Sequence, residues 1–220
     1  MLNIFKYDFS KALALSFYQR KPEIVANELL GKIIVRKEGK IILAARIVET
    51  EAYLSKDDLS CHASVGKTFR NAPMFESGGV LYVYKIYGVH HCINFVTEGD
   101  SIGSAVLIRA AEPLAGIEKM MENRSLKKTG KGEGKKERLD MKINDLCKGP
   151  GNLAKSFGFT KEDNFRSLIS PELFIQNPDK SDNIEVSVSK RIGITKSPNL
   201  FLRYFIENSP YVSGKKMKKL

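Results

Sequence analysis

Several residue types are scarce in this sequence, and each scarcity excludes a class of protein. The 220 residues include no tryptophan and only three cysteines, Cys61, Cys92 and Cys147. Scattered cysteines in odd number do not suggest a disulfide framework, so we expect an intracellular protein rather than a secreted domain. No run approaches the roughly 18 apolar residues of a membrane span, and the N-terminus lacks the pattern of a signal peptide. We therefore expect no membrane partner, and a location in the cytoplasm or nucleoid of a bacterium or in a eukaryotic nucleus.

Histidine is also scarce, which limits the metal sites that the sequence can build. The three histidines fall in two short clusters with cysteine, at 61–62 and 90–92. Neighbours in a strand point to opposite faces, so the second cluster offers at most two ligands to one side. The His-Glu-x-x-His and Cys-x-x-Cys spacings of zinc sites are absent. We expect no metal and no other cofactor, and keep as an alternative a metal-dependent hydrolase built on Glu51, His62 and His90.

Positive charge, in contrast, is abundant. Thirty-six lysines and arginines oppose 25 acidic residues, which gives a formal net charge of +11. Such an excess favours polyanionic partners such as nucleic acid, because binding releases condensed counterions. A generally basic proteome would give the same composition, so charge alone does not identify the partner.

The order of elements predicts one α+β domain in which strands outnumber helices. We expect helices at 22–30, 114–121 and 152–157, and strands at 32–35, 41–53, 80–95 with a turn at Tyr87-Gly88, 104–108, 173–175, 184–188 and 200–206. Glycines and lysines at 124–145 indicate a basic insertion, which is either a loop at a phosphate backbone or a solvated one. We predict a single domain over 1–213, followed by a basic tail over 214–220. Its fold is a curved antiparallel or mixed sheet flanked by helices, with a protruding β-hairpin.

Two carboxylates lie close together on one predicted strand. Alternation places Ile47, Glu49, Glu51 and Tyr53 on the same face. A buried carboxylate costs several kcal/mol unless it is paired or used in chemistry. The pair is therefore either catalytic, or bound to an arginine such as Arg109, or on a solvated face.

The second unusual segment is an aromatic hairpin over 80–95. Alternation puts Tyr82, Tyr84 and Ile86 on one face, and we expect Tyr82 to belong to the core. The turn leaves Tyr87 close to the tip, together with Val89 and His90. On a basic protein, an aromatic ring at a hairpin tip is suited to enter the minor groove and fill the space left by an extruded nucleotide. Tyr53 and Tyr84 would then stack on the extruded base.

Several longer strings occur in a fixed order that resembles one known family. They are RIVETEAY (46–53), His62, TFRN (68–71) with MF (74–75), LYVYKIYG (81–88), Asn94, VLIRAAEPL (106–114), LCKGP (146–150), RIGI (191–194) and SPYVS (209–213). The match covers most of the chain from Phe17 to Ser213, with differences in the basic insertion and at 163–182. The sequence resembles the alkyladenine (3-methyladenine) DNA glycosylases of the mammalian N-methylpurine type.

The resemblance implies a catalytic pair. Glu51 matches the general base that deprotonates the water attacking C1′ of the deoxyribose, and Arg109 matches the arginine that helps to hold that water and the carboxylate. Glu49 is then expected to be structural. The implied reaction is hydrolytic release of an alkylated purine from double-stranded DNA by a monomeric enzyme, which leaves an abasic site with no lyase step. A non-catalytic nucleic-acid-binding protein that uses the hairpin and the basic insertion is the other alternative.

The resemblance also implies how the base is held. Tyr53 and Tyr84 match stacking walls of the base pocket, His62 matches a hydrogen-bonding partner of the base, and Asn94 matches the residue that disfavours guanine by crowding its exocyclic amine.

At the hairpin tip, Tyr87 matches the intercalating tyrosine of the family. Val89 and His90 depart from the mammalian pattern, which has a methionine and an aromatic residue there. The departure leaves the lesion range open.

Overall fold

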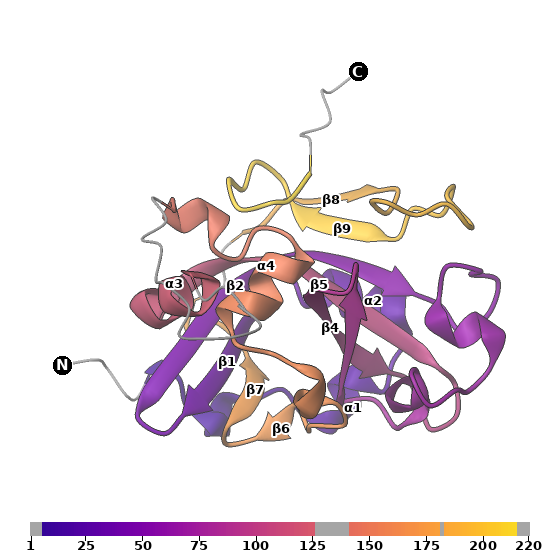
Figure 1. The fold of residues 1–220 in the computed structure, drawn as a ribbon, viewed down its shortest axis with the longest axis horizontal. Helices are drawn as coiled ribbons and strands as arrows, with labels where there is room; N and C mark the ends of the chain where they lie inside the picture. Colours follow the sequence, from indigo (N-terminus) through magenta and orange to yellow (C-terminus); the bar gives the residue numbers. More distant parts are fainter. Residues whose placement is uncertain (1–5, 126–140, 181–182, 215–220) are drawn as a thin grey trace.

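Nine strands in the described residues form one antiparallel sheet. The computed structural model describes residues 6–125, 141–180 and 183–214 (Figure 1). The sheet has the order β3-β4-β5-β2-β1-β7-β6, and β9 pairs with both β2 and β8. The strands are β1 (Ile33–Glu38), β2 (Ile41–Tyr53), β3 (Leu81–Ile86), β4 (His90–Thr97), β5 (Ser104–Ala115), β6 (Ile169–Ser170), β7 (Leu173–Gln176), β8 (Val186–Ser189) and β9 (Arg203–Ile206).

Strand β2 organises the sheet because it is long enough to have different neighbours along its length. On one side it pairs with β5 over most of its residues. On the other side, its first half pairs with β1 and its second half, from Glu49 to Glu51, pairs with β9. Its second half therefore lies in the interior of the sheet, between β5 and β9.

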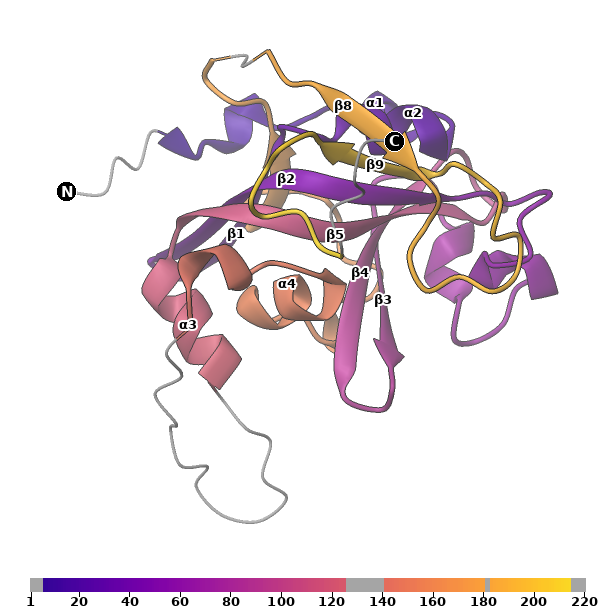
Figure 2. The same cartoon turned by 90° about the horizontal axis from the view of Figure 1, so that it is seen from above.

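Helices cover both faces of this sheet. They are α1 (Leu15–Tyr18), α2 (Pro22–Glu28), α3 (Ile117–Ser125) and α4 (Pro150–Ser156). Figure 2 shows α1 and α2 on one side of β2 and β5, and α3 and α4 on the other. Buried side chains of α2, α4 and the central strands share one large hydrophobic cluster. No helix in the described part of the chain is both long and apolar enough to cross a membrane.

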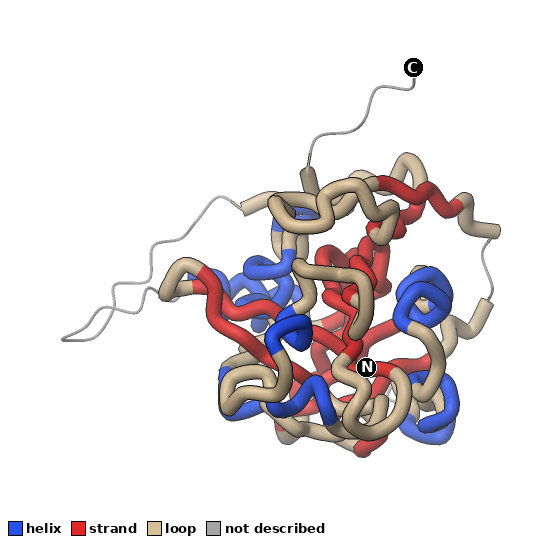
Figure 3. The backbone as a smooth tube through the Cα atoms, turned by 90° about the vertical axis from the view of Figure 1, so that its right-hand side faces the viewer, coloured by secondary structure: helices blue, strands red, loops and turns tan. Residues whose placement is uncertain are grey.

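The β3–β4 hairpin protrudes from the rest of the molecule, as Figures 2 and 3 show. The predicted α+β fold, with a sheet flanked by helices and a protruding hairpin, is confirmed, and the described sheet is antiparallel throughout. The proposed boundaries, 1–213 for the domain and 214–220 for the tail, remain predictions. The tail lies outside the described residues apart from Gly214.

One predicted helix, at 114–121, is wrong at its start. Strand β5 continues through Pro113 and Leu114 to Ala115, and α3 begins only at Ile117. Gly116 separates the two, with φ of 72° and so little space that an added Cβ would lie 2.5 Å from the carbonyl oxygen of Ile42. Tertiary contact with β2 therefore overrides the helix signal of proline, and a bulge at Leu114 accommodates it.

Several predicted boundaries also shift. Strand β1 runs on to Glu38, and β8 and β9 begin later than expected, at Val186 and Arg203. Most of the predicted basic insertion lies outside the described residues. At its near end, residues 124–125 belong to α3, and Ile143–Asp145 forms a 3-10 turn at its far end.

Candidate active site

The carboxylate of Glu51 is fully buried at the centre of the sheet. Glu51 pairs with Leu107 of β5 and with Arg203 of β9, and its side chain has no exposed surface. Its Oε2 accepts a hydrogen bond from the hydroxyl of Tyr53 at 2.9 Å. Its Oε1 accepts one from the backbone N–H of Ile192 at 2.8 Å and lies 3.2 Å from Nη1 of Arg109. These contacts fix the orientation of the carboxylate.

Two bulges direct the side chains of this region. The ladder pairs Ile47 with Ala111 and Glu49 with Ala110, which leaves Val48 as an extra residue on β2. The next step leaves Arg109 as an extra residue on β5. A bulge re-aims side chains, and here the unpaired Arg109 reaches both carboxylates. Simple alternation misplaced Ile47, which packs in the main hydrophobic core instead of beside them.

Glu49 is fully engaged in contacts within the protein. Its Oε1 accepts hydrogen bonds from Nε of Arg109 at 3.1 Å and from Nε of Arg203 at 2.7 Å, and its Oε2 accepts one from the backbone N–H of Ser213 at 2.7 Å. Arg203 also donates to the carbonyl oxygen of Ser213. Glu49 therefore connects β2, β5, β9 and the segment that follows β9.

The environment of Glu51 contains opposing influences on its pKa. Burial raises the pKa of this carboxyl above its ordinary value, and the charge of Arg109 is the strongest influence in the other direction. The N–H of Ile192 and the hydroxyl of Tyr53 also favour the ionised form, but burial dominates. The result is a carboxylate that accepts a proton more readily than a solvated one, as a general base requires.

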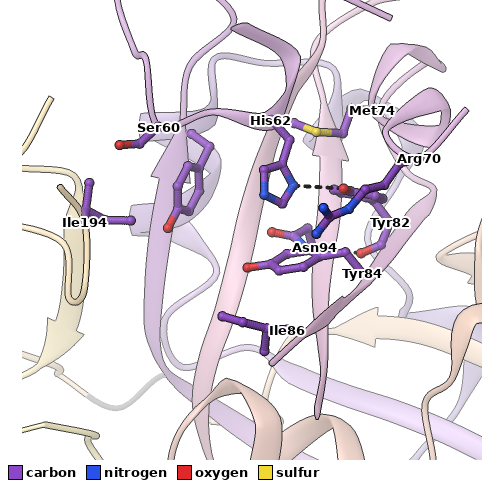
Figure 4. A pocket seen from close by; sticks show the side chains of 10 residues that line it. Ser60, His62, Arg70, Met74, Tyr82, Tyr84, Ile86, Asn94 and Ile194 are labelled. Atoms are coloured by element: carbon purple, nitrogen blue, oxygen red, sulfur yellow. Dashed lines mark hydrogen bonds between the residues drawn. The ribbon is translucent and has the colours of Figure 1, made fainter. Parts of the chain in front are cut away.

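A cavity of about 200 Å³ is lined in part by Tyr53, and Figure 4 shows the side chains that surround it. A cavity of about 150 Å³ holds a benzene ring in an engineered protein, so this one is large enough for a heterocyclic base. It brings together all four residues predicted for a base pocket, Tyr53, His62, Tyr84 and Asn94. The other lining residues are Ser60, Arg70, Met74, Tyr82, Ile86 and Ile194. Glu51 and Arg109 do not line the cavity, and the hydroxyl of Tyr53 connects it to the carboxylate.

The walls of the cavity are largely aromatic, and Arg70 is the one permanently charged side chain among the described residues that line it. The rings of His62 and Tyr84 are 4.6 Å apart at 77°, and those of Tyr82 and Tyr84 are 5.6 Å apart at 33°. Burial raises the pKa of all three tyrosines that line the cavity, that of Tyr82 to about 12. Their hydroxyl groups are therefore protonated at neutral pH.

The hydroxyl of Tyr82 and the imidazole of His62 form a hydrogen bond at the cavity wall. Tyr82 Oη lies 2.9 Å from Nδ1 of His62 (Figure 4). Burial, followed by the charge of Arg70, lowers the pKa of His62 below its ordinary value, so the imidazole is neutral at pH 7. The protonated hydroxyl of Tyr82 either donates to Nδ1, with the imidazole proton on Nε2, or accepts from Nδ1, with the proton there. Asn94 is also held in place, since its amide donates to the carbonyl oxygen of Tyr82 at 3.2 Å.

The residues predicted at the hairpin tip are exposed as expected. Tyr87 is 86 % exposed and Val89 is 70 % exposed, and His90 is exposed beside them. Tyr87 has φ of 50°, a left-handed conformation that costs a non-glycine residue about 1–3 kcal/mol. Gly88 follows with φ of 70°. The tip is separate from the cavity lining, although Ile86, which directly precedes Tyr87, belongs to it.

Some residues at this site had no role in the sequence-based prediction. Tyr82 is buried, as predicted, but it also lines the cavity. Arg70 lines it too, and its Nη2 lies 3.4 Å from the carbonyl oxygen of Lys85. The preceding Phe69 is fully exposed. Phe69 and Arg70 both belong to the string TFRN that resembles the family, so the sequence could have indicated them. The backbone N–H of Ile192, in contrast, leaves no pattern in a sequence.

The metal-dependent alternative receives no support from the arrangement of side chains. It requires Glu51, His62 and His90 around one point. His62 lies in the cavity, whereas His90 is exposed at the base of the hairpin turn. Within residues 6–125, 141–180 and 183–214, no three histidine, cysteine, aspartate or glutamate side chains are grouped as a metal site requires.

A buried carboxylate behind an aromatic cavity, beside a protruding hairpin on a basic chain, is the arrangement of an enzyme that acts on an extruded nucleotide. Comparison with known proteins agrees. Residues 16–210 match the family model described as methylpurine-DNA glycosylase (MPG), and the chain belongs to this family. It is therefore a DNA glycosylase of base-excision repair.

Three similar proteins bear the name "Putative 3-methyladenine DNA glycosylase". The protein from Koribacter versatilis (strain Ellin345) is 44 % identical over 206 residues, which are 93 % of this chain and 94 % of that protein. The protein from Chlorobium phaeobacteroides (strain BS1) is 42 % identical over 208 residues, 94 % of this chain and 98 % of that protein. The protein from Legionella pneumophila (strain Paris) is 37 % identical over 206 residues, 92 % of this chain and 98 % of that protein.

Proposed function

We propose that this glycosylase hydrolyses the N-glycosidic bond of alkylated purines of the 3-methyladenine type in duplex DNA, and that Glu51 is its general base. The observation that carries the proposal is the link between cavity and carboxylate: Tyr53 lines the cavity and donates a hydrogen bond to Glu51. A base held against Tyr53 would have its sugar directed towards Glu51, whereas the other carboxylate of this strand, Glu49, is fully engaged with Arg109, Arg203 and Ser213.

In the proposed reaction, a water oxygen forms a bond to C1′ as the bond from C1′ to the purine nitrogen breaks. The electron pair of that bond leaves with the base and neutralises the positive charge of the alkylated ring. Glu51 accepts the proton of the water, and its negative charge stabilises the developing sugar cation. Arg109, 3.2 Å from Oε1, favours the ionised form of the carboxylate and holds it in place.

The cavity favours an alkylated purine on electrostatic grounds. A purine alkylated at N3 or N7 carries a positive charge, and aromatic faces attract cations. His62 is neutral, so it adds no positive charge to that of Arg70 in the cavity lining. Tyr53 and Tyr84 stack on the base, His62 forms a hydrogen bond to it, and Asn94 crowds the amino group of guanine. Normal purines are also poorer leaving groups and resist extrusion, so selectivity does not depend on binding alone.

The same site favours a monofunctional, monomeric enzyme. A lyase step needs an amine that forms a Schiff base with the sugar. The described residues that line the cavity include no lysine, and Arg70 is their one permanent cation. All the groups assigned to the reaction come from one chain.

The hairpin tip and one neighbouring loop are proposed to contact the DNA. Tyr87 fills the space that the extruded nucleotide leaves, and Val89 and His90 lie against the groove beside it. The fully exposed Phe69 is a second aromatic contact, because it directly precedes Arg70 at the cavity just as Tyr87 directly follows Ile86.

The test is release of methylated bases from duplex DNA by the purified protein. Glu51→Gln is expected to abolish release, and Glu118→Gln, at an exposed carboxylate on α3, provides the matched control. Strand breakage should appear only after alkali treatment if there is no lyase step. Wild-type release by Glu51→Gln would overturn the proposed mechanism, and loss of activity with a chelator, restored by zinc, would favour the metal-dependent alternative.

A further inference from the structure

A buried ion pair lies just outside the cavity. Arg191 donates to both carboxylate oxygens of Asp58, from Nη1 at 2.6 Å and from Nη2 at 2.7 Å. The two side chains are 1 % and 0 % exposed. Neither side chain lines the cavity. A buried pair of this kind seldom stabilises a fold more than apolar residues of the same volume would. We therefore consider which neighbouring groups the pair holds in position.

On one side, the pair fixes the groups around Glu51. The guanidinium of Arg191 lies over the ring of Tyr53, 4.5 Å from its centroid, and its Nη1 donates to the carbonyl oxygen of Ala52 at 3.0 Å. The next residue, Ile192, supplies the backbone N–H that binds Oε1 of Glu51. Arg191 therefore supports the wall of the base pocket and also delivers a donor to the catalytic carboxylate.

On the other side, Asp58 organises the loop between β2 and His62. Its carboxylate accepts hydrogen bonds from the backbone N–H groups of Leu54 and Ser60, both at 3.1 Å. Its carbonyl oxygen accepts one from the N–H of Cys61, the residue before His62. Two further contacts join this loop to the segment after Arg191: the N–H of Leu59 donates to Oγ of Ser197, and Ser60 donates to the carbonyl oxygen of Lys196.

We infer that Asp58 and Arg191 form the positioning pair of this active site, which holds Tyr53 and the Ile192 N–H in register with Glu51. The inference rests on the proposed function. Neither residue touches the substrate, so their effect is on the rate of the chemical step and on the ionisation of Glu51 rather than on DNA affinity. The guanidinium plane is essential, because it forms two parallel hydrogen bonds and stacks on Tyr53 at once, which an ammonium cannot do.

The protein contains a matched control for this pair. Arg36 forms a buried ion pair with Asp163 at 3.2 Å, and its guanidinium also lies over an aromatic ring, that of Phe159, at 4.7 Å. Neither residue of this second pair lines the cavity or is among the groups that shift the pKa of Glu51. Arg36 also pairs with Glu38 at 2.8 Å. Arg191→Lys and Arg36→Lys therefore make the same chemical change at two largely buried arginines that are paired with carboxylates.

The experiment measures single-turnover base release, DNA affinity and thermal unfolding for Arg191→Lys, Asp58→Asn and Arg36→Lys. We expect Arg191→Lys and Asp58→Asn to slow release per folded molecule by about 10- to 100-fold, the range for a catalytic group displaced by a fraction of an ångström to 1 Å. The dissociation constant for damaged DNA should change less than about 2-fold. Arg36→Lys should lower thermal stability to a similar degree and leave the release rate unchanged.

The pH profile separates positioning from a general loss of structure. With the Ile192 N–H displaced, Glu51 loses a donor to its ionised form, so the acid limb of the rate should move to higher pH in Arg191→Lys and not in Arg36→Lys. The charged and titratable groups that face Glu51 are otherwise unchanged in these variants: Glu49 and Tyr53 on β2, Tyr84 on β3, Cys92 on β4 and Arg109 on β5.

The outcomes separate failure of the proposed function from failure of the positioning role of Asp58 and Arg191. If wild-type protein releases no alkylated base, the proposed function fails. If the wild type is active but Arg191→Lys and Asp58→Asn match its rate and its pH midpoint per folded molecule, the positioning inference fails and the proposed function stands. Equal loss of rate in Arg36→Lys would also overturn the inference, because the slower release would then follow from lower stability alone.

Discussion

The hydroxyl of Tyr53 lies 2.9 Å from Oε2 of Glu51, so the same side chain forms a wall of the cavity and a hydrogen bond to the buried carboxylate. The wall and the proposed general base are therefore coupled. A change at one alters the ionisation or the orientation of the other, and this coupling gives the first prediction.

Base release should rise with pH through the acid range, because only ionised Glu51 accepts a proton and burial raises the pKa of this group above its ordinary value. Tyr53→Phe retains the ring but removes a donor to the ionised form, which is worth about 1.5–3 kcal/mol for a charged acceptor. The acid limb should therefore move to still higher pH. Single-turnover rates across pH measure this shift, with Tyr84→Phe as the control on another wall. An unchanged limb in Tyr53→Phe would contradict the coupling.

The two carboxylates of β2 should respond oppositely to neutralisation. Because the pKa of Glu51 is raised in the folded protein, its ionised form opposes folding at neutral pH, and Glu51→Gln should not lower the free energy of unfolding. Glu49→Gln removes the partner of two buried arginines, Arg109 and Arg203, and should cost about 3–5 kcal/mol. Denaturant unfolding of both variants tests this contrast. Equal destabilisation would show that both carboxylates have the same structural role.

Tyr87→Gly should separate stability from activity. Glycine adopts the φ of 50° at this position without strain, so the free energy of unfolding should stay constant or rise by up to about 1 kcal/mol. Base release from duplex DNA should fall by about 10-fold or more, because an extruded nucleotide costs a few kcal/mol and nothing then fills its place. Release from single-stranded DNA should change much less. A variant with full activity on duplex DNA would exclude intercalation by Tyr87.

Tyr82→Phe should weaken recognition of the base without removing the cavity wall. Without the hydroxyl, Nδ1 of His62 loses its hydrogen-bond partner, and the imidazole proton is no longer held at one position. The expected loss is one hydrogen bond to the base, about 1 kcal/mol or roughly 5-fold in rate. Tyr18→Phe is the control, since the hydroxyl of Tyr18 is buried with no hydrogen-bond partner among the described residues. Rates on lesions with and without an acceptor at the contacted edge distinguish this role from a loss of packing.

Phe69→Ala should lower the affinity for damaged duplex DNA by about 5-fold or more, the effect of losing one stacking contact of about 1–3 kcal/mol. Thermal stability should not change, because the side chain is fully exposed. Ile24→Ala serves as the control, since Ile24 is exposed on α2, and α2 lies across β2 and β5 from the tip of the hairpin (Figure 2). Equal affinities for the two variants would remove Phe69 from the DNA interface.

Local periodicity made part of this site predictable. Tyr82, Tyr84 and Ile86 alternate on one strand, and all three line the cavity as alternation requires. The turn at Tyr87-Gly88 was equally readable, because glycine at a hairpin tip is a strong local signal. The helix predicted at 114–121 was wrong at its start, since pairing with β2 outweighs the preference of proline for a first helical turn.

The sequence by itself determined the alternation that lines the cavity, the exposed tip and, through its resemblance to a family, Glu51 as the carboxylate to test. Only the tertiary structure decided how Glu51 is held: Arg109 reaches it from a bulge, Ile192 binds it through a backbone N–H, and Arg191 supports it through Tyr53. The physical reason is that periodicity depends on neighbours in the chain. A bulge, a backbone donor and a buried ion pair depend on contacts between distant segments, which leave no pattern in the sequence.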